Sequence, residues 1–415
     1  MKKFFLYVST IVFITIPIIT FGQSNNRPSS IEQHELTITG YLQTQYQFTH
    51  TPGITSFSGG DFSTNSKDRF MIRRGRLKID RVDKFTNVVF QLDGTQNGVQ
   101  LMDAFIQLHD PNKKEFTLTA GLFNRPFGYS IVYSSGYRDF PERARVFQTI
   151  MPRERDLGVM IGYNPIGKYN FLTTEFAVIN GSGISARDYD SKKDIVGSIN
   201  LKFDSLVNNN FDIGFGGSFY NGYVRNNTQT IYKSRKGGYL VNTNPQNEGG
   251  YGDRNYYGVN LQLRYRTRLG ETDFKTEYVE GTQPGVEGNN TIKGPTASMS
   301  FNNQPATSLF VRPFNGYYFW LSHKFAKTNL TALLAYDVYD ANTDVNGSEI
   351  GKAGSFTNSG DMKYNTLGYG LTYEISKQIK FTLYNEHITN ENTLLNNYSN
   401  DIKDNVFTTR LQYRW

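Results

Sequence analysis

Two short runs of the chain carry basic residues at every second position. These residues are Arg74, Arg76, Lys78, Arg264, Arg266 and Arg268. In an extended strand alternate side chains point to the same face, so each run would present a row of cationic groups along one surface. Guanidinium groups bind planar oxyanions through two parallel hydrogen bonds, and a row of them offers repeated weak sites.

The same rows permit a second interpretation. Acidic residues fall within or close to the predicted strands, namely Asp80, Asp93, Asp103 and Glu277. The basic groups would then form internal salt bridges and leave the surface with little net charge. The sequence keeps both interpretations open.

A further set of arginines lies in the stretch 123–156. The set comprises Arg125, Arg138, Arg143, Arg145, Arg153 and Arg155. Four acidic residues accompany it, as do the rings of Phe127, Tyr129, Tyr133, Tyr137, Phe140 and Phe147. A loop that stayed in water would gain nothing from so many rings, so we expect this stretch to fold inward and constrict the interior of the protein.

Other kinds of chemistry find little support. The chain has no cysteine, which excludes disulfides, thiolate metal sites and a cysteine nucleophile. Its five histidines lack the spacing of a metal site, and no catalytic constellation is visible. Asp340, Asn342 and Asp344 resemble the first half of a calcium loop, but Val345 stands where such a loop needs glycine. We predict no metal, cofactor or catalytic residue, and interpret the stretch near Asp340 as a solvated loop, with calcium as the alternative.

The N-terminus has the pattern of a signal peptide. Lys2 and Lys3 precede an uncharged apolar run over residues 4–20, and small residues predict cleavage after Gly22. The alternative is a membrane anchor, but no stop-transfer flank follows the run. Losing the two lysines lowers the formal charge from +7 to +5 (7 − 2), which is too small for a nucleic-acid-binding surface.

Periodicity predicts the architecture of the mature chain. After residue 22 no apolar stretch approaches the roughly 18 residues of a spanning helix. Segments instead alternate apolar and polar residues, as where Phe407, Leu411 and Tyr413 oppose Arg410 and Gln412. The mean hydropathy is −0.51 although 15% of residues are aromatic. A transmembrane β-barrel with an apolar outside and a polar lumen combines these properties.

We count about sixteen strand candidates, an even number as expected for such barrels. They start near residues 36, 67, 86, 100, 115, 157, 171, 194, 211, 256, 272, 316, 328, 363, 379 and 404. Short links alternate with long ones, which predicts periplasmic turns at one end and extracellular loops at the other. The longest links are 123–156, 221–255 and 281–315. We therefore expect an all-β, antiparallel barrel over 36–415, after a short periplasmic segment over 23–35.

Part of this chain resembles a known family. Residues 68–77 (DRFMIRRGRL) resemble the arginine-rich second strand of the phosphate-selective porins of Gram-negative bacteria. Residues 103–106, 121–128, 142–143 and 153–159 extend the resemblance, which covers about residues 67–163. The tail with Tyr413 and Trp415 resembles the C-terminal signal read by the barrel assembly machinery, with Trp in place of the commoner Phe.

The resemblance implies a sixteen-stranded homotrimeric porin whose third loop enters the lumen and whose arginines guide anions. Its surroundings would be outer-membrane lipids and lipopolysaccharide. We accordingly expect passive diffusion of small hydrophilic solutes, with a preference for anions such as phosphate or other oxyanions, and no enzyme activity. The alternatives are a receptor or structural scaffold with a plugged lumen and, less favoured, a barrel enzyme.

Overall fold

The computed structural model describes residues 35–184, 188, 190–290 and 306–415. The predicted signal peptide, its cleavage after Gly22 and nearly all of the segment 23–35 lie outside these residues. Within them, no helix is long and apolar enough to cross a membrane.

Eighteen strands are present in the described residues. Their bounds are β1 (Glu35–Thr49), β2 (Asp68–Val82), β3 (Thr86–Thr95), β4 (Gly98–His109), β5 (Phe116–Asn124), β6 (Arg155–Tyr163), β7 (Leu172–Ile179), β8 (Asp194–Ser205), β9 (Phe211–Arg225), β10 (Thr230–Arg235), β11 (Gly238–Thr243), β12 (Tyr251–Thr267), β13 (Gly270–Gly285), β14 (Leu309–Phe325), β15 (Leu330–Asp340), β16 (Lys363–Glu374), β17 (Ile379–Asn390) and β18 (Val406–Arg414).

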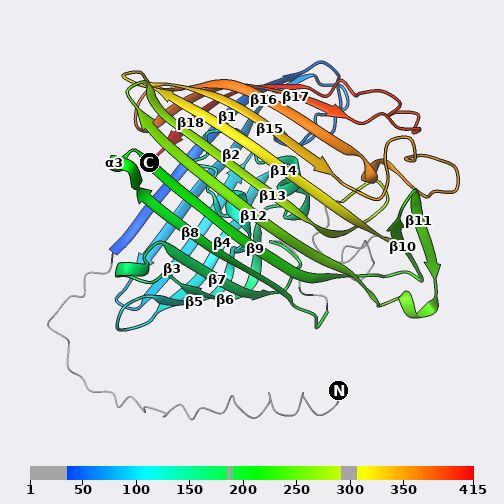
Figure 1. Ribbon diagram of the computed structural model, residues 1–415, viewed down its shortest axis with the longest axis horizontal. Coiled ribbons are helices and arrows are strands. Elements are labelled where there is room, and N and C mark those ends of the chain that lie inside the picture. The colour runs from blue at the N-terminus through cyan, green and yellow to red at the C-terminus, as the bar shows by residue number, and fades with distance from the viewer. Residues whose placement is uncertain (1–34, 185–187, 189, 291–305) are drawn as a thin grey trace, which may run out of the picture. The chain divides into compact units, whose positions relative to one another are not determined.

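All strands except β10 and β11 form one closed antiparallel barrel (Figure 1). The closure is direct, because β1 pairs with β2 on one side and with β18 on the other. β9 pairs with β12, so the barrel bypasses the two strands between them. The predicted sixteen-stranded antiparallel barrel is therefore confirmed, and each predicted strand corresponds to one strand of its wall.

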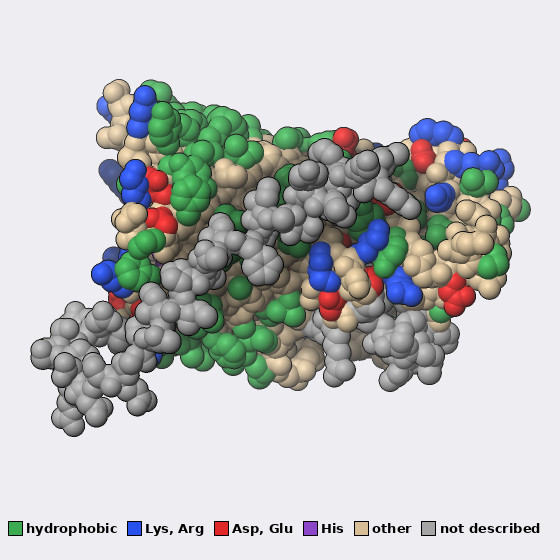
Figure 2. Space-filling view, turned by 90° about the horizontal axis from the view of Figure 1, so that it is seen from below, with side chains coloured by type: hydrophobic (Ala, Val, Ile, Leu, Met, Phe, Trp, Pro, Cys, Tyr) green, Lys and Arg blue, Asp and Glu red, His purple; other side chains and the backbone are tan. Residues whose placement is uncertain are grey.

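Side-chain alternation explains why these segments form strands. In β18 the burial alternates along the chain: Thr408, Arg410 and Gln412 are buried toward the lumen, whereas Phe407 and Leu411 are exposed on the outside. Figure 2 shows hydrophobic side chains spread over the barrel wall and charged side chains gathered toward its two ends. The outer face is thus apolar and the inner face polar, the reverse of a water-soluble domain.

Helices in the described part of the chain are few and short. They are α1 (Gly128–Val132), α2 (Arg145–Ile150) and α3 (Leu206–Asn209), with 3₁₀ turns at Gly167–Tyr169, Pro245–Asn247 and Ser359–Asp361. Both α1 and α2 belong to the link between β5 and β6. Arg155 and Asp156, which we had assigned to that link, are instead the first residues of β6.

The prediction that residues 221–255 form one long link without strands was wrong. β9 and β12 extend into it and pair as far as Arg225 with Tyr251, and the remainder contains the hairpin β10–β11. Figure 1 shows this hairpin beyond the wall, at the barrel end opposite the C-terminus. β10 also pairs in parallel with β14, where the Tyr232 ring stacks on Phe310 with 4.2 Å between centroids. Because the hairpin packs on β14 and on the link after β15 and not on lipid, its residues lack the alternation that identified the wall strands.

Candidate functional site

The link 125–154, which we call the lumen loop, lies inside the barrel. Its backbone carbonyls accept hydrogen bonds from inward-facing side chains of distant strands. Gln43 Nε2 of β1 donates to the Ser135 carbonyl at 3.1 Å, Lys380 Nζ of β17 to Arg138 at 3.0 Å, and Gln412 Nε2 of β18 to Gly136 at 3.0 Å. Strands that meet at the barrel seam therefore hold the loop from one side.

Aromatic packing holds the loop from the other side. Phe140 stacks on Trp320 of β14 with 5.0 Å between ring centroids, and Phe147 meets Tyr318 edge-on at 6.0 Å. The largest cluster of buried hydrophobic residues in the described chain is built around these rings. Burying such a ring stabilises the loop by roughly 1.5–3 kcal/mol, which accounts for Phe127, Phe140 and Phe147, whereas Tyr137 is exposed.

A carboxylate anchors the first turn of the loop. Glu277 of β13 accepts hydrogen bonds from the backbone N–H groups of Tyr129 and Ser130, each at 2.7 Å, and from the Tyr318 hydroxyl at 2.8 Å. Gly128 has φ +61°, and a Cβ there would collide with the Glu277 carboxylate. The salt-bridge interpretation would have made Glu277 a partner of lumen arginines, but its carboxylate binds the start of α1 instead, where the unpaired amides of a helix favour an anion.

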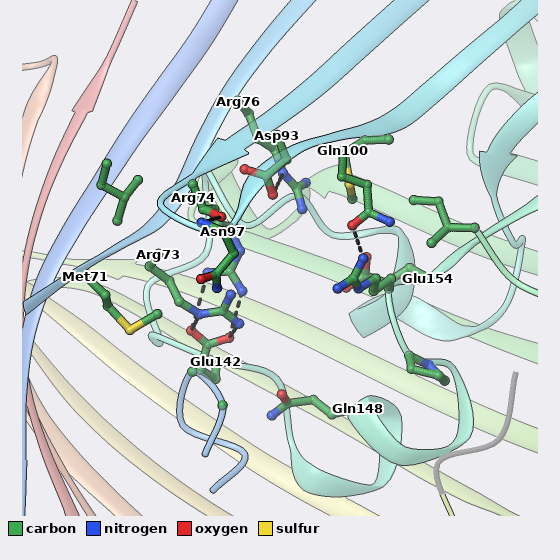
Figure 3. Close-up of a pocket in the computed structure, with 18 of the residues that line it drawn as sticks. Met71, Arg73, Arg74, Arg76, Asp93, Asn97, Gln100, Glu142, Gln148 and Glu154 are labelled. Carbon is green, nitrogen blue, oxygen red and sulfur yellow. Dashed lines mark hydrogen bonds and ion pairs between the residues drawn. The ribbon is translucent and has the colours of Figure 1, made fainter. Parts of the chain in front are cut away.

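The second half of the loop carries an ion cluster around Glu142. Its carboxylate accepts hydrogen bonds from Arg73 at 2.8 Å, Arg74 at 2.7 Å and Arg410 at 2.8 Å. Figure 3 shows Arg73 and Arg74 reaching from β2 toward it. Burial by itself would raise the pKa of the Glu142 carboxyl, but the three guanidinium groups hold this pKa well below its ordinary value. Three cations share one anion here, so the cluster keeps a surplus of positive charge.

A bulge brings Arg73 into this cluster. Gln43 pairs with Arg74 and Thr44 pairs with Ile72, so Arg73 is the extra residue of β2. Strict alternation would have turned its side chain outward. The bulge allows two consecutive arginines to face the lumen.

A cavity of about 840 Å³ adjoins the cluster (Figure 3). Five basic side chains and three acidic ones line it: Arg73, Arg74, Arg76, Arg143 and Arg153 against Asp93, Glu142 and Glu154. Arg76 pairs with Asp93 at 3.3 Å, and Arg143 pairs with Glu154. Arg153 donates to the neutral side chain of Gln100, so its charge is not balanced by this contact. We call this space the arginine cavity.

A second cavity, of about 720 Å³, is lined by the first part of the loop and has the opposite charge balance. Four basic side chains face five acidic ones: Lys78, Lys202, Arg264 and Lys275 against Asp103, Glu175, Asp204, Asp212 and Asp273. Arg264 pairs with Asp273 at 2.8 Å, Arg266 with Asp212 at 2.6 Å, and Lys78 with Asp80 at 2.7 Å. Here the basic side chains pair with carboxylates, as the second interpretation of the basic rows had it. Arg268 lies beyond the end of β12, exposed in the turn to β13, and so is not part of the inward-facing row.

The six arginines predicted for a constriction have different surroundings. Arg125 is buried against Asp156 at 3.0 Å, and Arg155 is buried against Asp103 at 2.9 Å. Arg138 is 3% exposed and its guanidinium has no hydrogen-bond partner among the described residues. Only Arg143 and Arg153 of the six line the arginine cavity as described above, while Arg145 lines a different one. Spacing could not separate these roles, because the fold of the loop decides which side chains face open space.

Two important contributors were not among the predicted site residues. Glu142 was one of several loop acids, and Arg410 was recognised only as an inward-facing residue of the last strand. Nothing in their local sequence joins them, since the contact spans 268 positions and depends on barrel closure.

The stretch near Asp340 has other contacts than those of a calcium loop. Asn342 donates to Asp361 at 2.9 Å and to the Tyr239 hydroxyl at 3.2 Å, and Asp344 pairs with Lys236 at 3.3 Å. The Asn342 side chain is buried, so it is not part of a solvated loop as we had expected.

Solved structures with a similar fold are outer-membrane channels. The outer-membrane channel DcaP of Acinetobacter baumannii is 15% identical, with a TM-score of 0.54 over 93% of this chain and 99% of that one. The fold is that of outer-membrane porins. An anion-selective porin from Comamonas acidovorans is 10% identical, with a TM-score of 0.55 over 92% of this chain and 100% of that one. Salmonella typhi OmpF, in complex with daunomycin, is 14% identical, with a TM-score of 0.52 over 92% and 98%.

No protein-family model matches the sequence, and no curated protein matches it either. The resemblance of residues 67–163 to phosphate-selective porins therefore stays a prediction.

Proposed function

We propose that this protein is an outer-membrane porin through which small hydrophilic solutes diffuse, with a preference for anions set at the arginine cavity. The observation that carries the proposal is the Glu142 cluster, in which three guanidinium groups share one carboxylate inside a closed barrel. Inside a protein wall of low dielectric such a surplus acts on a passing ion more strongly than it would in water.

The lumen loop sets the narrowest part of the path in this proposal. An anion would pass the arginine cavity, where Arg73 and the exposed Arg153 offer weak, exchangeable contacts. Most guanidinium donors of the cluster are already bound to protein acceptors, so the site attracts anions through its field without trapping them. Phosphate and other oxyanions suit guanidinium geometry, and the similar porin from Comamonas acidovorans is anion-selective.

The proposal places the barrel in the outer membrane as a homotrimer, in contact with lipids and lipopolysaccharide. Export would require the signal peptide, and insertion would use the barrel assembly machinery with Tyr413 and Trp415 as the signal. Both side chains point outward and their rings stack at 5.8 Å between centroids.

Planar bilayers test the proposal. Purified full-length protein should form stable open channels, and a tenfold KCl gradient should give a reversal potential of the sign for chloride preference. A clearly cation-selective potential would contradict the anion preference alone. Absence of any conductance from folded barrels would instead favour a receptor or scaffold with a plugged lumen.

A further inference from the structure

A third cavity, of about 820 Å³, lies where α2 of the lumen loop meets the links beyond β1, β13, β15 and β17. Its lining combines aromatic rings with polar side chains. The residues used below are Phe57, Asp61, Arg145, Tyr364, Tyr398 and Asp404. The arginine cavity shares Phe57 with it but none of the other five, so the two cavities differ in their chemistry.

Two rings fix the position of Arg145 in this cavity. Its guanidinium carbon lies 3.7 Å from the centroid of Tyr364 and 4.6 Å from that of Phe57. Such contacts favour the cation and hold it in one orientation. Tyr398 adds a further ring to the lining.

Buried polar atoms without partners point to a ligand. Arg145 Nε and Asp404 Oδ1 are both buried, and neither has a hydrogen-bond partner among the described residues. Arg145 is 8% exposed and Asp404 is 5% exposed. Leaving such atoms unpaired costs roughly 1–3 kcal/mol each, so the cavity is built for a guest that supplies an acceptor to Arg145 and a donor to Asp404.

The charges of the lining decide what kind of guest fits. One basic side chain, Arg145, stands against the two carboxylates Asp61 and Asp404. A phosphate or carboxylate ligand would satisfy Arg145 but would be repelled by both acids and could not donate to Asp404 when ionised. A hydroxyl group both donates and accepts, so neighbouring hydroxyls on one molecule satisfy both atoms.

We propose that this cavity binds a neutral saccharide. The hydroxyls of the sugar pair with Arg145 and Asp404, while its C–H face packs on the ring of Tyr398, and the Tyr364 ring holds Arg145 in position. The volume lies within the range typical of small-molecule sites, roughly 300–1,000 Å³. This site goes beyond the proposed anion pathway, because it uses a different cavity and uncharged ligands.

Isothermal titration calorimetry on detergent-solubilised full-length protein tests this proposal without relying on conductance. The probes are maltotriose, cellotriose and mannotriose, with inorganic phosphate as the charged comparison. We expect saturable binding of at least one trisaccharide. Asp404→Ala removes a hydrogen-bond acceptor, and Tyr364→Leu removes the ring that holds Arg145 in position. Each should weaken binding by about tenfold or more, the effect of losing one hydrogen bond to a charged group.

Tyr369→Leu is the matched control, since Tyr369 lies on the same strand as Tyr364 but faces outward. It should leave trisaccharide binding unchanged, and heat-modifiable migration should show that every variant folds. Absence of binding for all three trisaccharides would overturn the proposal, as would binding that Asp404→Ala and Tyr364→Leu leave intact. Phosphate binding that these two variants abolish would also overturn it and would assign the cavity to anions. A failed anion preference in bilayers would not affect it.

Discussion

The Glu142 carboxylate is the only acidic partner that the described contacts give to Arg73 and Arg410. Arg74 bonds the same carboxylate. Removing a buried charge from such a cluster leaves its partners uncompensated. Glu142→Gln should therefore lower the free energy of unfolding by about 3–5 kcal/mol and strengthen anion preference in channels that still fold. Urea unfolding in detergent measures the first effect and reversal potential the second.

The control for this change is Glu280→Gln. Glu280 is exposed and bonds only the Tyr278 hydroxyl in the described contacts, so its neutralisation should change neither quantity. Equal effects of the two variants would refute a special role for Glu142.

Individual arginines should differ in selectivity according to their partners. Arg153 is exposed in the arginine cavity and bonds a neutral glutamine, whereas Arg264 is balanced by Asp273. Arg153→Gln should therefore shift the reversal potential toward cations by more than Arg264→Gln does. A larger shift for Arg264→Gln would show that the second cavity controls selectivity.

Acid should break the ion pairs of Glu154 only at low pH. Burial would raise the pKa of Glu154, but Arg143 and Arg155 lower it to about 2. A lowered folded-state pKa gives stability that is fully present above the unfolded value of about 4.3 and is lost as pH falls toward the folded value. The contribution of Glu154 to the unfolding free energy should thus be constant from pH 8 to about 5 and should decline between about pH 4 and 2. In Glu154→Gln this part of the decline should be absent.

At the scale of elements, the lumen loop should limit the flow of ions. Deleting residues 129–147 removes the rings that pack on Trp320 and Tyr318 and the carboxylate that gathers three arginines. Conductance should rise several-fold, and anion preference should weaken because the remaining charges act across a wider, better-screened space. Single-channel recording measures both changes.

A second variant tests the loop without deleting it, in case the deletion variant misfolds. Glu277→Ala keeps the whole loop but removes the acceptor of the Tyr129 and Ser130 amides. It should increase current fluctuations without changing the mean selectivity. A folded deletion variant with wild-type conductance would show that the loop does not constrict the path.

The wall elements could be predicted because each strand has one face against an apolar exterior and one toward a polar lumen. Phe407 and Arg410 show this pattern within a few residues. The hairpin β10–β11 and the surroundings of Arg138 could not be predicted, because they depend on contacts between distant links. The sequence left open whether arginines pair with carboxylates, since Arg264 and Asp273 are neighbours only through strand register.

At the scale of the whole molecule, the barrel depends on one seam. Trp415 N–H donates to the Gly40 carbonyl at 3.1 Å, and Gly40 N–H donates to the Trp415 carbonyl at 3.2 Å. A Cβ on Gly40 would meet the Trp415 ring and the Arg76 carbonyl, so the last ring packs directly over the first strand. The final residue thus completes the ladder that joins β18 to β1 and leaves no open strand edge.

Deleting Trp415 should therefore lower the yield of assembled barrel in the outer membrane by removing both the last ladder bonds and the terminal ring. Trp415→Ala keeps the backbone bonds and loses only the ring, whereas Trp415→Phe keeps an aromatic ring in place. If the ring acts as the assembly signal, the alanine variant should resemble the deletion and the phenylalanine variant should resemble the wild type. If the ladder bonds dominate, both substitutions should assemble normally and only the deletion should fail. Heat-modifiable migration of membrane fractions measures the yield, and an undiminished yield for the deletion would contradict both roles.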